Sequence, residues 1–280
     1  MFEGLEFTKM HGNGNDFVVV DEFHEEVVPE EHKPQFVRAV CKPRFGVGAD
    51  GAIFVQPSSV ADAKFRYFNS DGSEAAMCGN GIRCFARYVV EEGYADRRFK
   101  AETLAGIKEL EVSVKDGEYW VRVDMGKPVF EPAKIPAAGG TFDGVWHDTF
   151  ELFGRKVDVY AVNTGVPHAV VFVDSLDFDI LEARKIRYNK AFPEGTNVNF
   201  ARIVSRNEVE VRTYERGVED ETLSCGTGSV AVVAVASKLG LIEPEAIVKT
   251  KGGVLRIEVR DTAFMTGKAT RVFDGVLKEL

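Results

Sequence analysis

The sequence contains two short segments in which a cysteine precedes a glycine-rich turn: Met77-Cys78-Gly79-Asn80-Gly81 and Ser224-Cys225-Gly226-Thr227-Gly228. Cys225 lies 147 residues after Cys78. A helix-like stretch follows each cysteine and stops at a glycine 15 residues later, at Gly93 and Gly240. Glycine is common just beyond a helix C-terminus. The spacing therefore predicts a duplicated chain in which one helix begins at each cysteine.

Other segments extend this repeat over most of the chain. Three pairs resemble each other: Gly106–Val112 with Gly253–Val259, Gly14–Asp21 with Gly165–Asp174, and Met125-Gly126-Lys127 with Thr266-Gly267-Lys268. In the first pair apolar and polar residues alternate, and in the second pair a glycine turn precedes a run of β-branched residues. Both patterns are typical of strands. The chain is thus interpreted as two similar halves that meet near residues 122–128.

The pattern of each half favours an α+β fold, because short strands flank a single helix and no series of strand-helix-strand crossovers is present. In the first helix Arg83 and Arg87 fall opposite the apolar positions, so we expect one face to meet solvent. The second helix carries the wholly apolar run Val230–Ala236 and must be enclosed on every side. We therefore expect two halves, each a mostly antiparallel sheet curled around a central helix.

The composition excludes several classes of function. The 35 Lys and Arg against 44 Asp and Glu leave a net charge of −9, which is the wrong sign for binding nucleic-acid phosphates. Val230–Ala236 is the longest apolar run, far below the roughly 18 residues needed to span a bilayer. The acidic N-terminus does not look like a secretory signal. We expect a cytoplasmic protein with neither nucleic acid nor membrane as a partner.

The positions of Cys78 and Cys225 indicate chemistry. A helix N-terminus favours a thiolate, and its free amides can bind a substrate carboxylate. Cys41 and Cys84 have no such setting and are expected to be structural. One reactive thiol in each half suits three roles: a redox disulfide, paired nucleophiles, or an acid and a base on opposite faces of one substrate. The third role uses both copies and favours an epimerase or racemase.

Energetics limit how such a reaction can proceed. The α-proton of an amino acid is far less acidic than a thiol, and each unit of pKa mismatch costs about 1.36 kcal/mol. A helix N-terminus supplies only about 0.3–1 kcal/mol at an exposed site and about 2 when partly buried. Amides on the carboxylate and exclusion of water must supply most of the rest. We therefore predict a closed, dry site between the halves.

The chain also resembles the diaminopimelate epimerase family over nearly its whole length. The resemblance rests on Lys9–Phe17, Asn69–Glu74, Cys78–Arg87, Tyr214–Gly217 and Cys225–Gly228. It implies two pseudo-symmetric domains, with residues 1–123 completed by a C-terminal strand at about 269–280, and residues 124–268 forming the repeat. It also implies epimerisation between the LL and meso forms without a cofactor, as a step of lysine biosynthesis.

The resemblance implies roles for particular residues. Cys78 and Cys225 would be the acid and base, with His168 and Glu215 tuning or relaying protons. The substrate would contact Asn15, Asn69, Asn197 and Arg216 at its distal end, Glu215 at the ammonium, and Gly79, Asn80, Gly226 and Thr227 at the reacting carboxylate. The chain departs from the family at Gly51, where some members have Gln, and at Val166, where many have Asn. One amide contact is thus missing, and Asn163 is a candidate to replace it.

Three other hypotheses remain open. The chain could be a proline racemase-like enzyme, which also pairs two cysteines, or a non-catalytic amino-acid-binding module, which would tolerate loss of both cysteines. Cys78 and Cys225 could also form a reversible disulfide that switches the enzyme off. The Gly46–Gly51 pattern mimics a dinucleotide-binding turn, but no strand precedes it. The five His are scattered, so we expect no metal. Nothing in the sequence indicates pyridoxal phosphate, and the family resemblance implies a reaction without a cofactor. An amino acid is the expected small-molecule partner, and a homodimer is left open.

Overall fold

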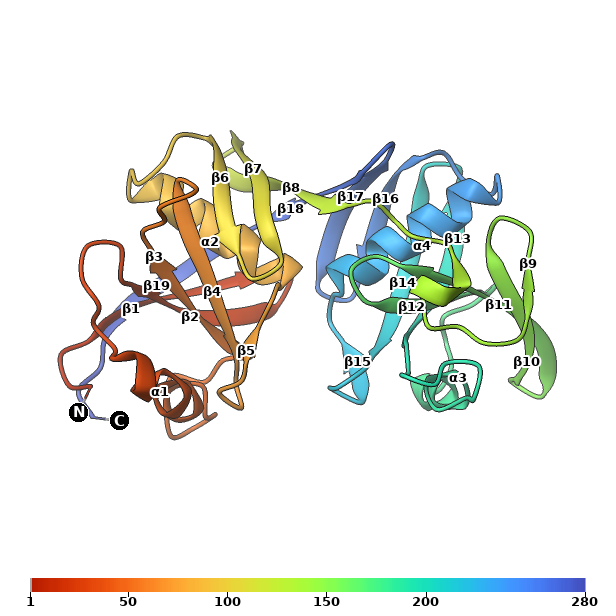
Figure 1. The fold of residues 1–280 in the computed structure, drawn as a ribbon, viewed down its shortest axis with the longest axis horizontal. Coiled ribbons are helices and arrows are strands. Elements are labelled where there is room, and N and C mark those ends of the chain that lie inside the picture. The colour runs from red at the N-terminus through yellow and green to blue at the C-terminus, as the bar shows by residue number, and fades with distance from the viewer. Residues whose placement is uncertain (1, 280) are drawn as a thin grey trace. The chain divides into compact units, whose positions relative to one another are not determined.

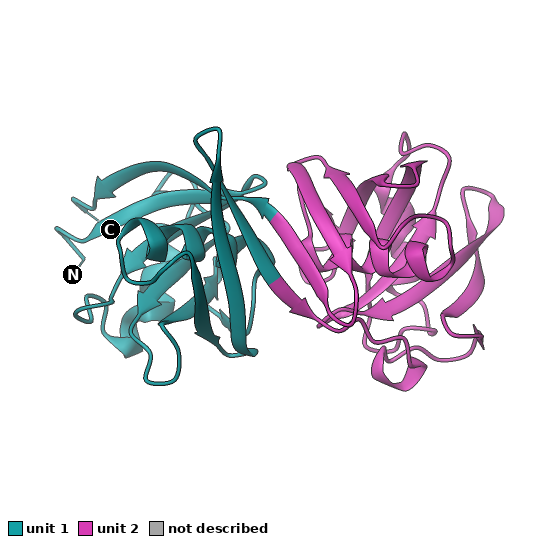
Figure 2. Ribbon diagram, turned by 90° about the horizontal axis from the view of Figure 1, so that it is seen from above, with its two compact units in different colours: residues 1–123, 267–280 teal, residues 124–266 magenta. Residues whose placement is uncertain are grey.

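The chain folds into two compact units in the computed structural model, which describes residues 2–279 (Figure 2). Unit 1 runs up to Val123 and resumes at Gly267, and unit 2 comprises Asp124–Thr266. The chain changes unit within strands β8 (Glu118–Gly126) and β18 (Ala263–Lys268). Lys268 contacts unit 1, where its Nζ pairs with Glu118 at 2.5 Å and its carbonyl accepts from Arg83 Nε at 3.2 Å.

The sheet of unit 1 curls around helix α2 (Gly79–Glu91) (Figure 1). Hydrogen-bonded neighbours give the order β19, β1, β2, β3, β4, β6, β7, β8, with short β5 also on β4. The remaining bounds are β19 (Thr270–Val276), β1 (Glu6–Gly12), β2 (Asn15–Asp21), β3 (Gly51–Gln56), β4 (Ala63–Asn69), β5 (Glu74–Ala75), β6 (Arg98–Thr103), β7 (Gly106–Lys115), the 3-10 turn η1 (Glu30–His32) and helix α1 (Lys33–Val40).

The sheet of unit 2 curls in the same way around helix α4 (Gly226–Lys238). Its order is β10, β11, β12, β13, β14, β16, β17, with β9 on β10 and β15 on β14. The bounds are β9 (Thr141–Phe142), β10 (Trp146–Leu152), β11 (Arg155–Asn163), β12 (Pro167–Phe172), β13 (Asn197–Ser205), β14 (Glu208–Glu215), β15 (Asp220–Thr222), β16 (Glu245–Thr250), β17 (Gly253–Val259), 3-10 turns η2 (Pro132–Lys134) and η3 (Ile180–Ala183), and helix α3 (Arg184–Arg187).

The two sheets repeat one topology. Each is antiparallel except at two equivalent pairs, β2–β3 and β4–β6 in unit 1, and β12–β13 and β14–β16 in unit 2. A parallel pair needs a crossover, and in each unit the β4–β6 or β14–β16 crossover is the central helix. The α+β class and the internal repeat predicted from the sequence are confirmed.

Strands β2 and β3 have nearly continuous apolar sequences because both of their faces are buried. In β2 and β3, Val18, Val20 and Phe54 pack toward α1 with Phe36, while the alternate residues face the other side of the sheet. Around α4 every residue from Val230 to Ala236 is at most 1% exposed. Within the described residues, no helix is both long and apolar enough to cross a bilayer.

Helix α2 departs from its sequence pattern at Arg83. The periodicity put Arg83 on a solvent face, but its side chain is fully buried. Its guanidinium donates to the carbonyls of Gly79 at 3.0 Å and Lys268 at 3.2 Å, and to Asn13 Oδ1 at 3.4 Å. Arg87 is half-buried and pairs with Glu91 at 2.9 Å. The expected solvent face is therefore covered by residues distant in sequence.

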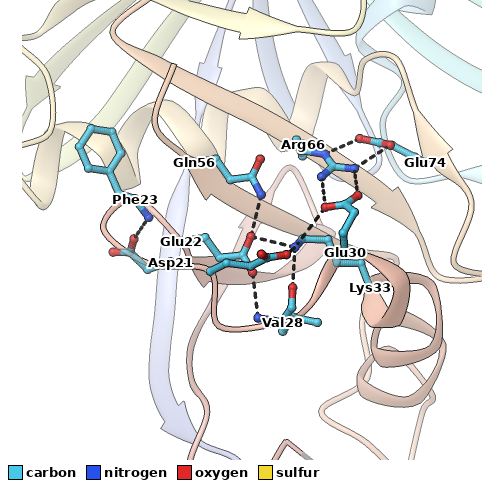
Figure 3. A network of polar contacts seen from close by, with 10 residues as sticks. Asp21, Glu22, Phe23, Val28, Glu30, Lys33, Gln56, Arg66 and Glu74 are labelled. Carbon is cyan, nitrogen blue, oxygen red and sulfur yellow. Dashed lines mark hydrogen bonds and ion pairs between the residues drawn. The ribbon is translucent and has the colours of Figure 1, made fainter. Parts of the chain in front are cut away.

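A second buried cation anchors the start of α1 (Figure 3). Lys33 Nζ is fully buried and lies 3.2 Å from Glu22, whose side chain is 1% exposed. It also lies 3.3 Å from Glu26 and 3.4 Å from Glu30. The Val28 carbonyl accepts from the same ammonium at 2.6 Å. Lys33 thus compensates the buried Glu22 carboxylate just after β2, and it shares Glu30 with Arg66, which lies 2.6 Å from that carboxylate.

Candidate active site

Cys78 and Cys225 are the N-caps of α2 and α4, as the repeat predicted. Both cysteines have extended backbones, and each sulfur accepts the amide N–H three residues on, from Gly81 or Gly228, at 3.4 Å. Cys78 is half-buried and Cys225 is 8% exposed. Each thiol therefore sits at the positive end of a helix dipole, beside amides that have no intrahelical partner.

The half-site of unit 1 gathers three of the predicted residues. Asn15 Oδ1 lies 3.7 Å from Cys78 Sγ and accepts from Asn80 Nδ2 at 3.2 Å. Asn15 Nδ2 donates to Asp50 Oδ2 at 2.6 Å. Because a carboxylate only accepts, Asp50 fixes which way the Asn15 amide points. The carbonyl of Asn15 is thereby held toward the thiol.

Arg83 adds a positive charge to this half-site. Burial lowers the pKa of Arg83 to about 10, so the guanidinium remains protonated at neutral pH. The guanidinium donates to the carbonyl of Gly79, the residue after Cys78, which brings its charge close to this thiol. The charges of Cys84 and Cys78, in that order, raise the Arg83 pKa against the effect of burial. A buried cation at this place favours the thiolate of Cys78.

Gly51 and Asn69 are register partners on β3 and β4. A Cβ at residue 51 would lie 2.5 Å from the Phe68 carbonyl oxygen and 2.6 Å from the ring of Tyr67. Tyr67 thus occupies the space of a side chain at this position. The Asn69 amide donates to Ser73 Oγ at 3.0 Å and holds the turn after β4.

The half-site of unit 2 is a chain of hydrogen bonds that ends at Cys225. His168 Nε2 lies 2.9 Å from Thr227 Oγ1, which lies 3.4 Å from Cys225 Sγ. The other ring nitrogen of His168 faces Asn199 Nδ2 at 3.0 Å. Burial, reinforced by the charge of Arg216, lowers the pKa of His168 to about 3. His168 is therefore neutral at physiological pH and reaches the thiol through Thr227.

Glu215 and Arg216 lie where β14 ends and the following turn begins. The Arg216 amide donates to Asn197 Oδ1 at 2.9 Å, and its guanidinium donates to the carbonyl of Glu194 at 3.0 Å. The turn is closed by Glu219, which accepts from the Gly217 amide at 3.1 Å. Asn197 therefore positions the backbone that carries Arg216. Glu215 is the last residue of β14 and pairs in register with Asp220.

Asn163, the candidate to replace the missing amide, is engaged in its own turn. Its Nδ2 donates to the Lys134 carbonyl at 2.7 Å, and its Oδ1 accepts from the Gly165 amide at 2.9 Å. These bonds shape the turn that precedes His168. Val166 in that turn is half-buried, and its carbonyl accepts a hydrogen bond from the Thr164 amide.

Asp50 and Asn199 are site residues that were not predicted from the sequence. Asp50 was noted only as part of a glycine-rich pattern, yet it orients Asn15. Asn199 is fully buried on β13, two residues after Asn197 and hence on the same face of the strand. An amide repeated at this period within an apolar strand was the available signal, because buried amides need partners.

We expect Cys78 and Cys225, but not the other two cysteines, to react with iodoacetamide in the native protein at neutral pH. Burial raises the pKa of Cys41 and of Cys84 to about 12, and their side chains are 1% and 0% exposed. Mass spectrometry of peptides before and after denaturation checks this. Labelling of Cys84 at the rate of Cys78 in folded protein would contradict it.

Alanine should be tolerated at Gly81 and not at its counterpart Gly228. A Cβ at Gly81 meets Cys78 and Ile53 atoms at 3.4 Å or beyond, whereas at Gly228 it would lie 2.3 Å from Asn199 Oδ1. Overpacking of this kind costs about 1–3 kcal/mol. Urea unfolding should show a lower midpoint for Gly228→Ala only. Equal loss in both variants would show that helix termini, rather than Asn199, set the cost.

Among the described residues, no group of three or more His, Cys, Asp and Glu side chains is arranged to hold a metal ion. The polar atoms gathered at the two thiols are instead amides, hydroxyls, the imidazole and the guanidinium. Each half-site can therefore bind an anion at its helix N-terminus and can exchange a proton at its sulfur.

Solved structures of a probable proline racemase, a hydroxyproline epimerase and a PhzF-family protein share this fold. A probable proline racemase from Agrobacterium radiobacter K84 has a TM-score of 0.69 at 15% identity, over 98% of this chain and 92% of that one. A hydroxyproline epimerase from Agrobacterium vitis has 0.69 at 17%, over 98% and 91%. A PhzF-family protein from Bacillus anthracis has 0.70 at 19%, over 98% and 99%. These likenesses show that the chain has the fold shared by these racemase, epimerase and PhzF structures.

Sequence comparison identifies the family to which the chain belongs. The family model described as "Diaminopimelate epimerase" matches residues 7–131 and 160–272. A diaminopimelate epimerase of Archaeoglobus fulgidus is 66% identical over 98% of this chain and 96% of its own length. One of Methanothrix thermoacetophila is 52% identical over 98% and 96%. The chain belongs to the diaminopimelate epimerase family.

Proposed function

We propose that this protein interconverts LL- and meso-diaminopimelate, with Cys78 and Cys225 as its two proton-transfer groups. The observation that carries the proposal is the repeated N-cap cysteine, which puts one thiol at each of two helix N-termini in a chain of this family. A single nucleophile would need only one such copy. Two thiols suit a reaction in which a proton leaves one face of a carbon and another arrives on the opposite face.

The proton transfer proceeds without a covalent intermediate. One thiolate takes the α-proton and becomes a thiol, while the other thiol gives its proton to the opposite face and becomes a thiolate. The configuration at the α-carbon is inverted, and the two sulfurs exchange protonation states. The reverse reaction uses the same groups in exchanged roles. This requires both units to bring their thiols to one α-carbon, in the dry site expected from the energetics.

The carbanion-like transition state needs stabilisation at the reacting carboxylate. Amides at the N-termini of α2 and α4, from Gly79 and Asn80 and from Gly226 and Thr227, are proposed to bind it. These amides lie in the first helical turns and have no intrahelical carbonyl to bond. Preorganised donors of this kind are worth about 2.7–4 kcal/mol each when charge develops on the bound oxygen.

The distal end of the substrate carries a second carboxylate and ammonium. We assign Arg216 to the carboxylate, because a guanidinium binds a carboxylate through two parallel hydrogen bonds. Glu215 is assigned to the ammonium, and Asn15, Asn69 and Asn197 to the remaining polar contacts. Asn197 acts here by holding the Arg216 backbone. The reaction is placed in the cytoplasm, where reducing conditions keep both thiols available.

The test is loss of the α-proton signal in D2O, followed by proton NMR with reductant and no added cofactor. LL-diaminopimelate and L-proline are offered separately to the purified protein. We expect washout and inversion with diaminopimelate and none with proline. Exchange with proline alone would instead support a proline racemase-like enzyme. Binding of diaminopimelate without exchange would favour a non-catalytic module.

A further inference from the structure

Asn199 is a fully buried amide that no part of the proposed mechanism uses. Its Nδ2 lies 2.9 Å from the Ala169 carbonyl oxygen and 3.0 Å from His168 Nδ1. A backbone carbonyl only accepts, so the NH2 group must face Ala169. Oδ1 accepts from the Thr213 hydroxyl at 3.0 Å on the other side. Chemistry therefore fixes the orientation of the Asn199 amide.

This orientation decides the tautomer of His168. The NH2 group of Asn199 donates to Nδ1, so Nδ1 must be the unprotonated nitrogen of the neutral ring. The proton of the ring is then on Nε2, which faces Thr227 Oγ1 at 2.9 Å. His168 donates to the hydroxyl oxygen rather than accepting from it.

The direction of the remaining bond follows. The Thr227 hydroxyl has one hydrogen, and its oxygen is engaged as the acceptor from His168, so the hydrogen is available to Cys225 Sγ at 3.4 Å. The Gly228 amide donates to the same sulfur at 3.4 Å. Donors aimed at a sulfur favour its thiolate. Reversing the His168 tautomer would turn the Thr227 hydrogen toward the ring and away from the sulfur.

We propose that Asn199 is a positioning residue that sets the Nε2–H tautomer of His168 and thereby makes Thr227 a hydrogen-bond donor to the Cys225 thiolate. The repeat explains why unit 2 needs this relay. Val230 stands 147 residues after Arg83, so α4 carries an apolar residue where α2 carries its buried cation. The relay takes over the stabilising role in unit 2.

The first test uses the unaltered protein. In 15N-histidine-labelled protein, long-range 15N–1H correlation spectra distinguish the two neutral tautomers and the charged ring. We expect His168 as the Nε2–H tautomer at neutral pH, assigned by the signal that disappears in His168→Gln. A signal of the Nδ1–H tautomer or of a protonated ring would overturn the proposal.

The second test compares alkylation of Cys225 with that of Cys78 in the same molecules, by iodoacetamide at fixed pH without substrate. In Asn199→Asp the carboxylate can only accept, so Nδ1 must carry the proton. In Thr227→Val the donor to sulfur is gone. We expect alkylation of Cys225 to slow about 10-fold or more relative to Cys78, because a hydrogen bond to a charged group is lost. Thr227→Ser keeps the hydroxyl and should retain the wild-type ratio.

The variants leave the other charged group near the relay in place. Arg216 lies after β14 and acts on His168 through its charge. Unchanged alkylation ratios in folded Asn199→Asp and Thr227→Val would refute the relay. If Asn199→Asp does not fold, Thr227→Val and the His168 spectrum still decide. The inference rests on the proposed function for its meaning, but thiol reactivity is read without turnover, so failure of one is distinguishable from failure of the other.

Discussion

Alanine at Cys78 or at Cys225 is expected to lower the rate of inversion by at least about 10²–10⁴-fold, the usual contribution of a positioned acid or base. Each thiol serves one face of the α-carbon, so either loss should stop inversion from both LL- and meso-diaminopimelate. Binding of the substrate should persist, because the helix N-terminal amides remain. Proton NMR of α-proton washout and of stereoisomer ratios, with calorimetric titration of substrate, measures both effects.

The matched controls are Cys41→Ala and Cys84→Ala. These thiols are buried in unit 1 away from the helix N-cap, and burial raises the pKa of each to about 12. Both variants should turn over at close to the wild-type rate once folded. Full inversion by either N-cap variant would remove the two-thiol mechanism. A large rate loss in Cys84→Ala at wild-type stability would show that a third thiol takes part.

Replacing Lys33 with methionine is expected to destabilise the protein by about 3–5 kcal/mol, as when one partner of a buried ion pair is removed. Lys33 Nζ lies 3.2 Å from Glu22, whose side chain is 1% exposed. Without the ammonium, Glu22 keeps hydrogen bonds from Gln56 at 2.7 Å and the Val28 amide at 3.0 Å but loses its compensating charge. Figure 3 shows these two donors and the Lys33 ammonium around the Glu22 carboxylate. Urea unfolding of the full chain measures the effect.

Lys64→Met provides the surface comparison. Lys64 pairs with Glu102 at 3.3 Å, and their side chains are 33% and 27% exposed, so its loss should cost less than about 1 kcal/mol. The double change Lys33→Met with Glu22→Gln should recover part of the loss, because the orphaned charge is removed. Equal destabilisation by the two lysine variants would show that the Lys33 cluster contributes only as a surface pair does.

Local patterns in the sequence were enough to predict the architecture. The spacing between Cys78 and Cys225 revealed the duplication, and the apolar run Val230–Ala236 required a helix enclosed on all sides. These features depend on residues close together in the chain, whose periodicity and capping preferences are local physical properties. The same local patterns predicted that Cys78 and Cys225 each lie at a helix N-terminus.

The tertiary structure alone decided which polar groups meet. Arg83 is buried because Asn13 and the Lys268 carbonyl, far away in sequence, cover it. Lys33 is buried because η1 folds back beside Glu22 at the end of β2.

Sequence patterns determined the repeat, the central helices and the place of the thiols in this protein, because spacing and hydrophobic periodicity are written along the chain. The relay from Asn199 to Cys225 was decided by the parallel pairing of β12 with β13, which sets His168 beside Asn197 and brings Asn199 to its ring. Strand register and the direction of a hydrogen bond depend on partners that only folding brings together, and no pattern within one segment specifies them.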